Sequence, residues 1–226
     1  MKEAPVIVAL DGLSWPEALA IATDLQGKVW GYKVHDLFEQ EILKGHNIIP
    51  VLKQFGKVFL DLKFHDIPAT VGKRVKVYAE SGADIMTVHA SGGAKMIAEA
   101  VKNRGKAMIA AVTVLTSLEE EETQEIYNQP TLEQVHNLAK IAMRGGAQAM
   151  VSSPKELAML AQDPELKSLL RIVPGIRRPD DAKDDQKRTM AATDALAAGA
   201  SLLVVGRPLT KAPNPSEALT RLFPHT

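Results

Sequence analysis

The chain has 226 residues, of which 46% are hydrophobic and 24% are charged, proportions typical of a folded protein that buries a sizeable core. Its 27 lysine and arginine residues balance 27 aspartate and glutamate residues, so the overall charge gives no reason to expect a nucleic acid or a membrane surface as partner. The chain has no cysteine, which excludes disulfides, thiolate nucleophiles and cysteine-ligated metals. No apolar run is long enough for a signal-peptide core or a membrane span, and we expect a cytoplasmic protein.

Eight short apolar segments alternate with helical patterns, which is typical of βα units that build a parallel sheet. The length suits a barrel that occupies the whole chain. We therefore predict an α/β protein with one domain, a (β/α)8 TIM barrel over residues 1–226. The predicted strands are residues 6–10, 29–34, 58–62, 84–88, 107–112, 147–151, 171–173 and 201–205. Ser14-Trp15-Pro16-Glu17 predicts the start of the first helix.

The second and third predicted strands end in charged residues. Asp61 and Lys63 are two positions apart, so a regular strand points both side chains to one face, into the mouth of the barrel. Lys33 lies near the end of the neighbouring strand. Opposite charges about 4 Å apart attract by roughly 4 kcal/mol at an effective dielectric near 20, so we expect a lysine there to remain an ammonium ion. Such a cluster suits acid catalysis or charge stabilisation and disfavours a Schiff-base lysine.

Two other interpretations of these charges stay open. They can form an ion-pair network that only closes the top of the barrel. Alternatively, Asp61, His65 and Asp66 are possible ligands of a divalent metal. Lys63 lies between these residues and repels a cation, which disfavours the metal site.

Other polar residues that follow strands each have two interpretations. Asp11 can bind sugar hydroxyls or form an ordinary turn with the glycine after it. His89 can be catalytic or a hydrogen-bonded structural histidine. Thr116 and Ser117 can present a hydroxyl to a ligand or cap the next helix. Residues 91–95 faintly resemble a phosphate loop but lack the full Walker spacing.

The loops after the last two strands indicate a phosphate site, because such loops commonly bind phosphate in these barrels. Gly206 and Arg207 follow the eighth strand, and a guanidinium can hold a phosphate dianion in a bidentate manner. Pro174 and Arg177, after the seventh strand, supply the other wall. The almost wholly polar segment that follows, within residues 176–188, is either a loop that closes over the phosphate or a solvated surface loop.

Together these residues resemble a known family. Asp61-Leu62-Lys63-Phe64-His65-Asp66-Ile67-Pro68 is similar to the full signature of the type 1 orotidine 5′-phosphate decarboxylases. Four further motifs match the family's order and spacing: Val88-His89-Ala90-Ser91-Gly92-Gly93, Ala111-Val112-Thr113-Val114-Leu115-Thr116-Ser117, Val173-Pro174-Gly175-Ile176-Arg177 and Gly206-Arg207-Pro208. The resemblance covers essentially the whole chain. It implies decarboxylation of orotidine 5′-phosphate to UMP and CO2, the last step of de novo pyrimidine nucleotide biosynthesis, without metal or other cofactor.

The resemblance also implies roles for individual residues. Lys33, Asp61, Lys63 and Asp66 match the family's charged tetrad, in which Lys63 protonates C6 of the pyrimidine and Asp61 lies near the departing carboxylate. It implies a homodimer in which Asp66 and Thr70 reach the partner's active site. The remaining implied contacts are Asp11 and Lys33 with the ribose, Ser117 with the pyrimidine amide, and Gln186, Gly206 and Arg207 with the phosphate.

Two residues depart from the family pattern, although neither replaces a member of the tetrad. His35 stands where glycine often follows Lys33-Val34, and Ala69 stands where asparagine is common. A metal-dependent phosphosugar decarboxylase or aldolase of the same suprafamily is an alternative function, which Lys33 and residues 64–68 argue against. Another is a catalytically inactive barrel that binds nucleotides, which the intact tetrad argues against.

Overall fold

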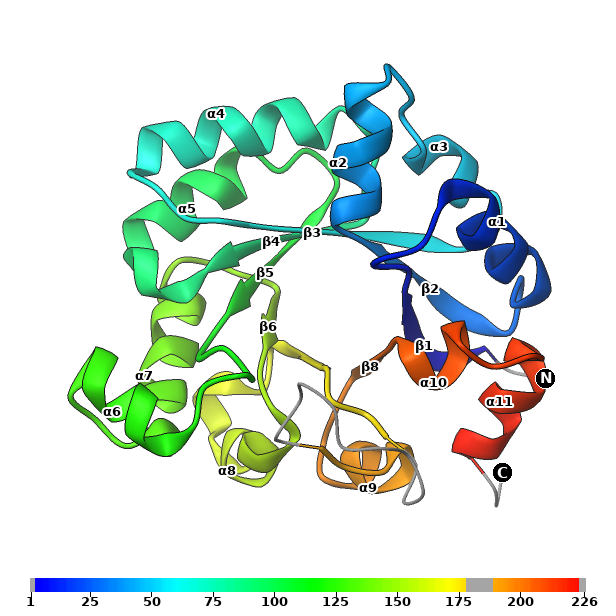
Figure 1. Cartoon of the computed structure of the whole chain (residues 1–226). Coiled ribbons are helices and arrows are strands. Elements are labelled where there is room, and N and C mark those ends of the chain that lie inside the picture. Colours follow the sequence, from blue (N-terminus) through cyan, green and yellow to red (C-terminus); the bar gives the residue numbers. More distant parts are fainter. Residues whose placement is uncertain (1–2, 178–188, 224–226) are drawn as a thin grey trace.

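The computed structural model describes residues 3–177 and 189–223. Eight parallel strands form a closed barrel, each pairing with the next in the chain and β8 with β1, and helices surround them (Figure 1). The strands are β1 (Ala4–Ala9), β2 (Val29–Val34), β3 (Lys57–Phe64), β4 (Ile85–His89), β5 (Met108–Val112), β6 (Ala149–Val151), β7 (Leu170–Val173) and β8 (Leu202–Val205). The predicted (β/α)8 barrel and its eight strands are confirmed.

The helices lie in the connections between strands and after β8. They are α1 (Trp15–Asp24), α2 (Asp36–Leu43), α3 (Ile49–Leu52), α4 (Pro68–Ala79), α5 (Gly93–Asn103), α6 (Glu120–Tyr127), α7 (Thr131–Arg144), α8 (Leu157–Gln162), α9 (Ala192–Ala197), α10 (Arg207–Thr210) and α11 (Pro215–Leu222). Short 3₁₀ turns span Ala90–Gly92, Pro154–Glu156 and Pro164–Leu166. Across residues 3–177 and 189–223, the longest apolar helical stretches fall short of what a membrane crossing requires.

The first helix begins where the sequence predicts. Ser14 is its N-cap, and the Glu17 carboxylate accepts hydrogen bonds from the Ser14 backbone N–H at 2.8 Å and from the Ser14 hydroxyl at 2.6 Å. Pro16 fits the first turn because the N–H that it lacks has no helical partner there. This capping box fixes the direction in which the chain leaves β1 for the outside of the barrel.

Alternate residues of the strands build two separate apolar layers. Val6 and Val8 belong to the large layer between the strands and the surrounding helices, whereas Ile7, between them, faces the inside of the barrel. The interior layer is made by buried residues from seven strands: Ile7, Phe59, Ile85, Ala110, Ala149, Ile172, Leu202 and Val204. These side chains fill the barrel, so a ligand has room only at its mouth.

Strand β3 is longer than predicted and irregular near its end. Its pairing with β4 passes from Leu60 opposite Met86 to Phe64 opposite Val88, so Asp61, Leu62 and Lys63 stand opposite Thr87 alone. Lys63 has a φ of 47°, in the left-handed region that non-glycine residues rarely adopt. The regular alternation from which the sequence placed Asp61 and Lys63 on one face is therefore absent here, because the strand bulges between them.

Candidate active site

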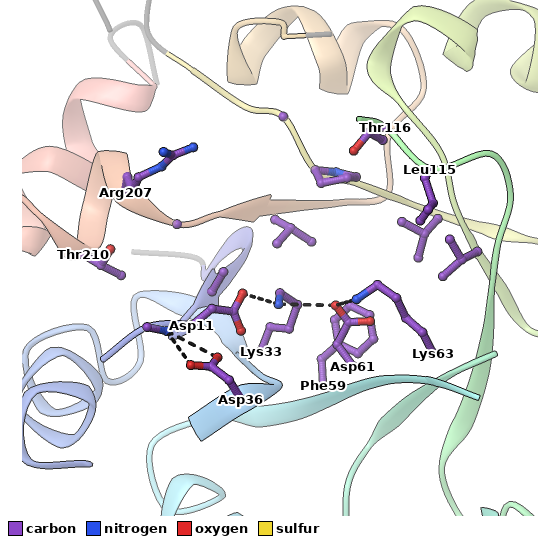
Figure 2. A pocket seen from close by; sticks show the side chains of 18 of the residues that line it. Asp11, Lys33, Asp36, Phe59, Asp61, Lys63, Leu115, Thr116, Arg207 and Thr210 are labelled. Carbon is purple, nitrogen blue, oxygen red and sulfur yellow. Dashed lines mark hydrogen bonds and ion pairs between the residues drawn. The ribbon is translucent and has the colours of Figure 1, made fainter. Parts of the chain in front are cut away.

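A pocket of about 630 Å³ opens at the carboxyl ends of the strands (Figure 2). Its wall includes Asp11 after β1, Lys33 at the end of β2, and Asp61 and Lys63 on β3. The segments after β5, β7 and β8 complete the wall. Polar side chains thus gather at the end of the barrel where the apolar interior stops, which is where enzymes of this fold carry their chemistry.

Four of these side chains form one chain of alternating charge. The Lys63 Nζ lies 2.8 Å from Asp61 Oδ2, and the Lys33 Nζ lies 3.3 Å from the same oxygen. The Lys33 ammonium also pairs with Asp11 Oδ2. Figure 2 shows the resulting line Asp11, Lys33, Asp61, Lys63 along the floor of the pocket. The ion pairs that the sequence predicts among Lys33, Asp61 and Lys63 are present in spite of the bulge in β3.

Burial and charge have opposite effects on the two innermost members of this chain. Burial alone raises the pKa of the Asp61 carboxyl, but the ammonium groups of Lys33 and Lys63 and the Thr87 hydroxyl hold that pKa below its usual value. Burial alone lowers the pKa of Lys33, but the carboxylates of Asp61 and Asp11 raise it above its usual value. Both groups are therefore charged at neutral pH. The side chains of Lys33 and Asp61 are 10% exposed and that of Lys63 is 34% exposed, so Lys63 is the member that presents its ammonium to the cavity.

His35, one of the two departures from the family pattern, contacts the backbone of this cluster. Its Nδ1 lies 2.6 Å from the carbonyl oxygen of Asp61. A carbonyl oxygen only accepts, so the imidazole carries a proton on Nδ1 and donates it. Next to it, the Asp36 carboxylate accepts the N–H of Gly12 at 3.0 Å. These two bonds tie the loop after β2 to the end of β3 and to the loop after β1.

Two arginines mark the other part of the pocket wall. Arg177 follows β7 and Arg207 follows β8, and Figure 2 shows Arg207 and Thr210 at the end of the pocket away from Lys63. Gly175 has a φ of 79°, a conformation that favours glycine, where the chain turns after β7. The ammonium of Lys63 and the guanidinium of Arg207 therefore lie at two ends of one cavity.

Comparison with known proteins places this geometry in a family. Residues 4–222 match the model of the orotidine 5′-phosphate decarboxylase / HUMPS family. The chain belongs to that family. An orotidine 5′-phosphate decarboxylase of Synechococcus sp. is 42% identical, with 94% of this chain and 91% of that protein covered. One of Legionella pneumophila is 40% identical, with 96% and 97% covered.

Solved structures agree with this assignment. A crystal structure of orotidine 5′-phosphate decarboxylase from Lactobacillus acidophilus superposes with a TM-score of 0.81 at 35% identity, covering 97% of both chains. A conserved protein of Geobacillus kaustophilus, described as uncharacterised, gives a TM-score of 0.80 at 32% identity, covering 96% of this chain and 98% of that one.

The structure brings most of the predicted family residues to the pocket. Those in its wall are Asp11, Lys33, Asp61, Lys63, Pro174, Arg177, Gly206 and Arg207. Ser117 is exposed and outside the wall, where Leu115 and Thr116 lie instead. Asp66 and Thr70 also lie outside the wall of this chain's own pocket. Gln186, and the predicted phosphate-closing segment from residue 178 on, lie outside the described residues.

Three residues at or beside the pocket carry no signal in the sequence for the contacts they make. Thr210 lies three residues after Arg207 and lines the pocket, but a lone threonine in a short helix carries no signal. Thr87 is fully buried in β4 and bonds to both Asp61 and Lys63. His35 differs from the glycine that is common in the family, but nothing in the sequence indicates its hydrogen bond to the Asp61 carbonyl.

The metal site considered from the sequence does not assemble. Within residues 3–177 and 189–223, no three histidine, aspartate or glutamate side chains converge to hold a metal ion. Asp61 Oδ2, the atom best placed to bind one, already contacts two ammonium groups. His89 lies outside the pocket wall and packs against the ring of His65, with centroids 5.4 Å apart, which favours a structural role for it.

Proposed function

We propose that the protein decarboxylates orotidine 5′-phosphate to UMP and carbon dioxide, in de novo pyrimidine nucleotide biosynthesis. The observation that carries this proposal is the Lys63 ammonium, held 2.8 Å from Asp61 in a cavity whose other end bears Arg207 and whose wall also includes Arg177. A substrate with a phosphate at one end and a pyrimidine carboxylate at the other matches this arrangement of charge. Family membership supports the same substrate.

The difficult step is the loss of carbon dioxide, because the C6–carboxylate bond breaks and leaves its electron pair on C6. Enzymes lower such barriers by roughly 8 to 23 kcal/mol. A fixed ammonium beside C6 stabilises the developing negative charge and then gives C6 its proton. In this proposal Lys63 is that group, and Asp61, held in place by Lys33, lies beside the departing carboxylate.

The other substrate contacts follow from the wall of the pocket and from the family resemblance. Asp11 and Lys33 bind ribose hydroxyls, and Arg207 holds the phosphate by charge-assisted hydrogen bonds. The remaining proposed contacts are Pro174, Arg177, Gln186 and Gly206 around the phosphate and Ser117 at the pyrimidine amide. The closing role of residues 176–188 stays a prediction.

We infer that the active enzyme is a homodimer that shares residues between sites. Asp66 is exposed and lies outside the wall of its own chain's pocket, and it is followed by Ile67, which is 66% exposed. Thr70 lies four residues after Asp66, in the first turn of α4. The family resemblance, together with the exposure of Asp66 and the place of both residues outside their own chain's pocket wall, supports a contribution of Asp66 and Thr70 to the partner's site. The cytoplasmic location stays a prediction.

One assay tests the proposed reaction against its rivals. The protein is incubated with orotidine 5′-phosphate and a chelator, and the loss of the orotate absorbance is followed, with Lys63→Ala as the control variant. We expect turnover that the chelator leaves unchanged and that Lys63→Ala abolishes. Turnover that requires added metal supports a metal-dependent phosphosugar enzyme instead, and UMP binding without any turnover supports an inactive nucleotide-binding barrel.

A further inference from the structure

The bulge in β3 leaves a backbone donor without its usual partner. Because Asp61, Leu62 and Lys63 stand opposite Thr87 alone, the regular ladder of hydrogen bonds between β3 and β4 is interrupted there. Lys63 has a left-handed conformation, with a φ of 47°, and its N–H donates to a side-chain oxygen of β4. A non-glycine residue keeps such a conformation only where its surroundings hold it.

The side chain of Thr87 fills this gap. Its hydroxyl oxygen accepts the backbone N–H of Lys63 at 2.8 Å, and the hydroxyl donates to Asp61 Oδ1 at 2.9 Å. Thr87 is 0% exposed, so water does not compete for either bond. A hydroxyl has one proton to donate, and here it is directed to the carboxylate oxygen that does not bind the lysines.

These contacts act on both members of the central ion pair. Asp61 Oδ2 receives the ammonium groups of Lys33 and Lys63, so the bond to Oδ1 fixes the rotation of the carboxylate about its own axis. The bond to the Lys63 N–H fixes the backbone from which the Lys63 side chain starts, and so the direction in which it enters the cavity. A small error in that direction moves the ammonium away from the reacting carbon.

We propose that Thr87 is a positioning residue of the active site, whose single hydroxyl holds the Asp61 carboxylate and the Lys63 backbone in the geometry that proton transfer requires. This inference rests on the proposed function. Thr87 itself touches no pocket surface and acts through its two neighbours.

The chain offers a matched control for this role. Thr113 follows β5, is 1% exposed, and donates its hydroxyl to the backbone carbonyl of Val151 at 2.8 Å. It is thus another buried threonine near the same end of the barrel, but its hydroxyl bonds to neutral backbone rather than to the charged chain. Replacement by valine nearly keeps the shape of either residue and exchanges the hydroxyl for a methyl group, which neither donates nor accepts a hydrogen bond.

The experiment compares Thr87→Val, Thr87→Ser and Thr113→Val in steady-state kinetics with orotidine 5′-phosphate, with the melting temperature of each measured alongside. We expect Thr87→Val to lower kcat by about tenfold to a hundredfold, the range expected when a buried donor loses its partner and the cost falls on the transition state. KM should change much less, because the ribose and phosphate contacts are untouched. Thr87→Ser should recover most of kcat, and Thr113→Val should keep it.

Three results overturn the proposal: full kcat in Thr87→Val, an equal loss in Thr87→Ser, or an equal loss in Thr113→Val. If Thr87→Val does not fold, Thr87→Ala takes its place, and full kcat in that variant overturns the proposal as well. Hydrogen exchange of the Lys63 amide gives a readout that does not depend on turnover. Protection in the wild type and in Thr87→Ser, lost in Thr87→Val, supports the contact even if the wild type fails to decarboxylate orotidine 5′-phosphate, an outcome that refutes only the proposed function.

Discussion

Arg207 is the residue whose role can be separated most cleanly from the chemistry at Lys63. It lines the pocket at the end away from Lys63, so its removal should weaken phosphate binding and leave the reacting groups in place. Hydrogen bonds to charged groups contribute about 1.5 to 3 kcal/mol, so we expect Arg207→Ala to lower kcat/KM for orotidine 5′-phosphate by roughly tenfold to a hundredfold. The measurement is repeated with orotidine, which lacks the phosphate. There the wild type and the variant should be equally slow, and a difference that persists with orotidine contradicts the phosphate role.

His89 gives the protein a pH-dependent contribution to stability. Burial lowers the pKa of its imidazole below the ordinary value of 6.5, and the positive charges of His65 and Lys63 lower it further, while Asp61 partly opposes them. The unfolded chain therefore binds a proton at this position more readily than the folded chain, and protonation favours unfolding. The contribution of His89 is complete above pH 6.5 and declines as the pH falls below it.

This direction of the pH dependence can be measured by comparison with a variant that has no ionisable group at position 89. In melting curves of the wild type and His89→Gln between pH 8 and pH 5, the wild type should lose stability relative to the variant as the pH decreases. Because His89 is only partly buried, we expect a relative shift on the order of a few degrees in Tm. A difference in Tm between the two proteins that stays constant from pH 8 to pH 5 contradicts a lowered pKa for His89.

Among single residues, the sequence predicted those whose position alone makes them unusual. A charged side chain at the end of an apolar strand has few structural explanations, and so Lys33, Asp61 and Lys63 stood out. Thr87 did not, because a threonine within a strand is ordinary, and its role depends on a bulge in the neighbouring strand. The register of two strands is a property of the folded pair and cannot be read from either strand alone.

At the level of elements, the close approach of β2 and β3 depends on a glycine. A Cβ added at Gly31 would lie 2.0 Å from the carbonyl oxygen of Lys57 and 2.7 Å from its carbonyl carbon. Both atoms belong to the backbone of the paired strand, so no side-chain rotation relieves the clash. We expect Gly31→Ala to destabilise the fold by about 3 kcal/mol or more, or to prevent folding, because overpacking against rigid backbone forces the strands apart.

Gly206→Ala is the control for this change. Gly206 also has a negative φ, −104°, but an added Cβ would come no closer than 3.6 Å to any atom beyond its two neighbours in the chain, an ordinary contact. Its free energy of unfolding in urea should stay within about 1 kcal/mol of the wild type. A Gly31→Ala variant as stable as Gly206→Ala would show that β2 and β3 can separate without cost.

The strands themselves were predictable because each contains a short apolar run with buried residues, bounded by helical pattern. Their ends were less so. β3 continues to Phe64 and β4 to His89, past the residues where the apolar pattern stops, because pairing with a neighbour rather than hydrophobicity extends them. The charged residues of β3 therefore lie within its paired length, at the bulge between Leu60 and Phe64, where Thr87 of β4 contacts both Asp61 and Lys63.

For the whole molecule, the central question is whether one active site draws on two chains. In a homodimer that exchanges Asp66, a Lys63→Ala chain and an Asp66→Asn chain are each inactive alone, because every site lacks one group. A mixed dimer differs. The site on the Asp66→Asn chain has its own Lys63 and receives an intact Asp66 from the partner, while the other site lacks both groups. Random mixing of equal amounts should thus restore about a quarter of the wild-type sites, since half the dimers are mixed and each has one complete site.

A second mixture provides the control that makes this result decisive. Asp61 and Lys63 lie 2.8 Å apart within one chain, so a Lys63→Ala chain mixed with an Asp61→Asn chain leaves every site defective. This mixture should stay inactive under the same conditions, with subunit exchange verified in both by mass spectrometry of differently tagged chains. Recovery in the first mixture alone is expected from the exposed position of Asp66, beside Ile67 and outside the wall of its own pocket. If exchange occurs and neither mixture recovers, Asp66 serves its own chain or neither site, and the shared site is refuted.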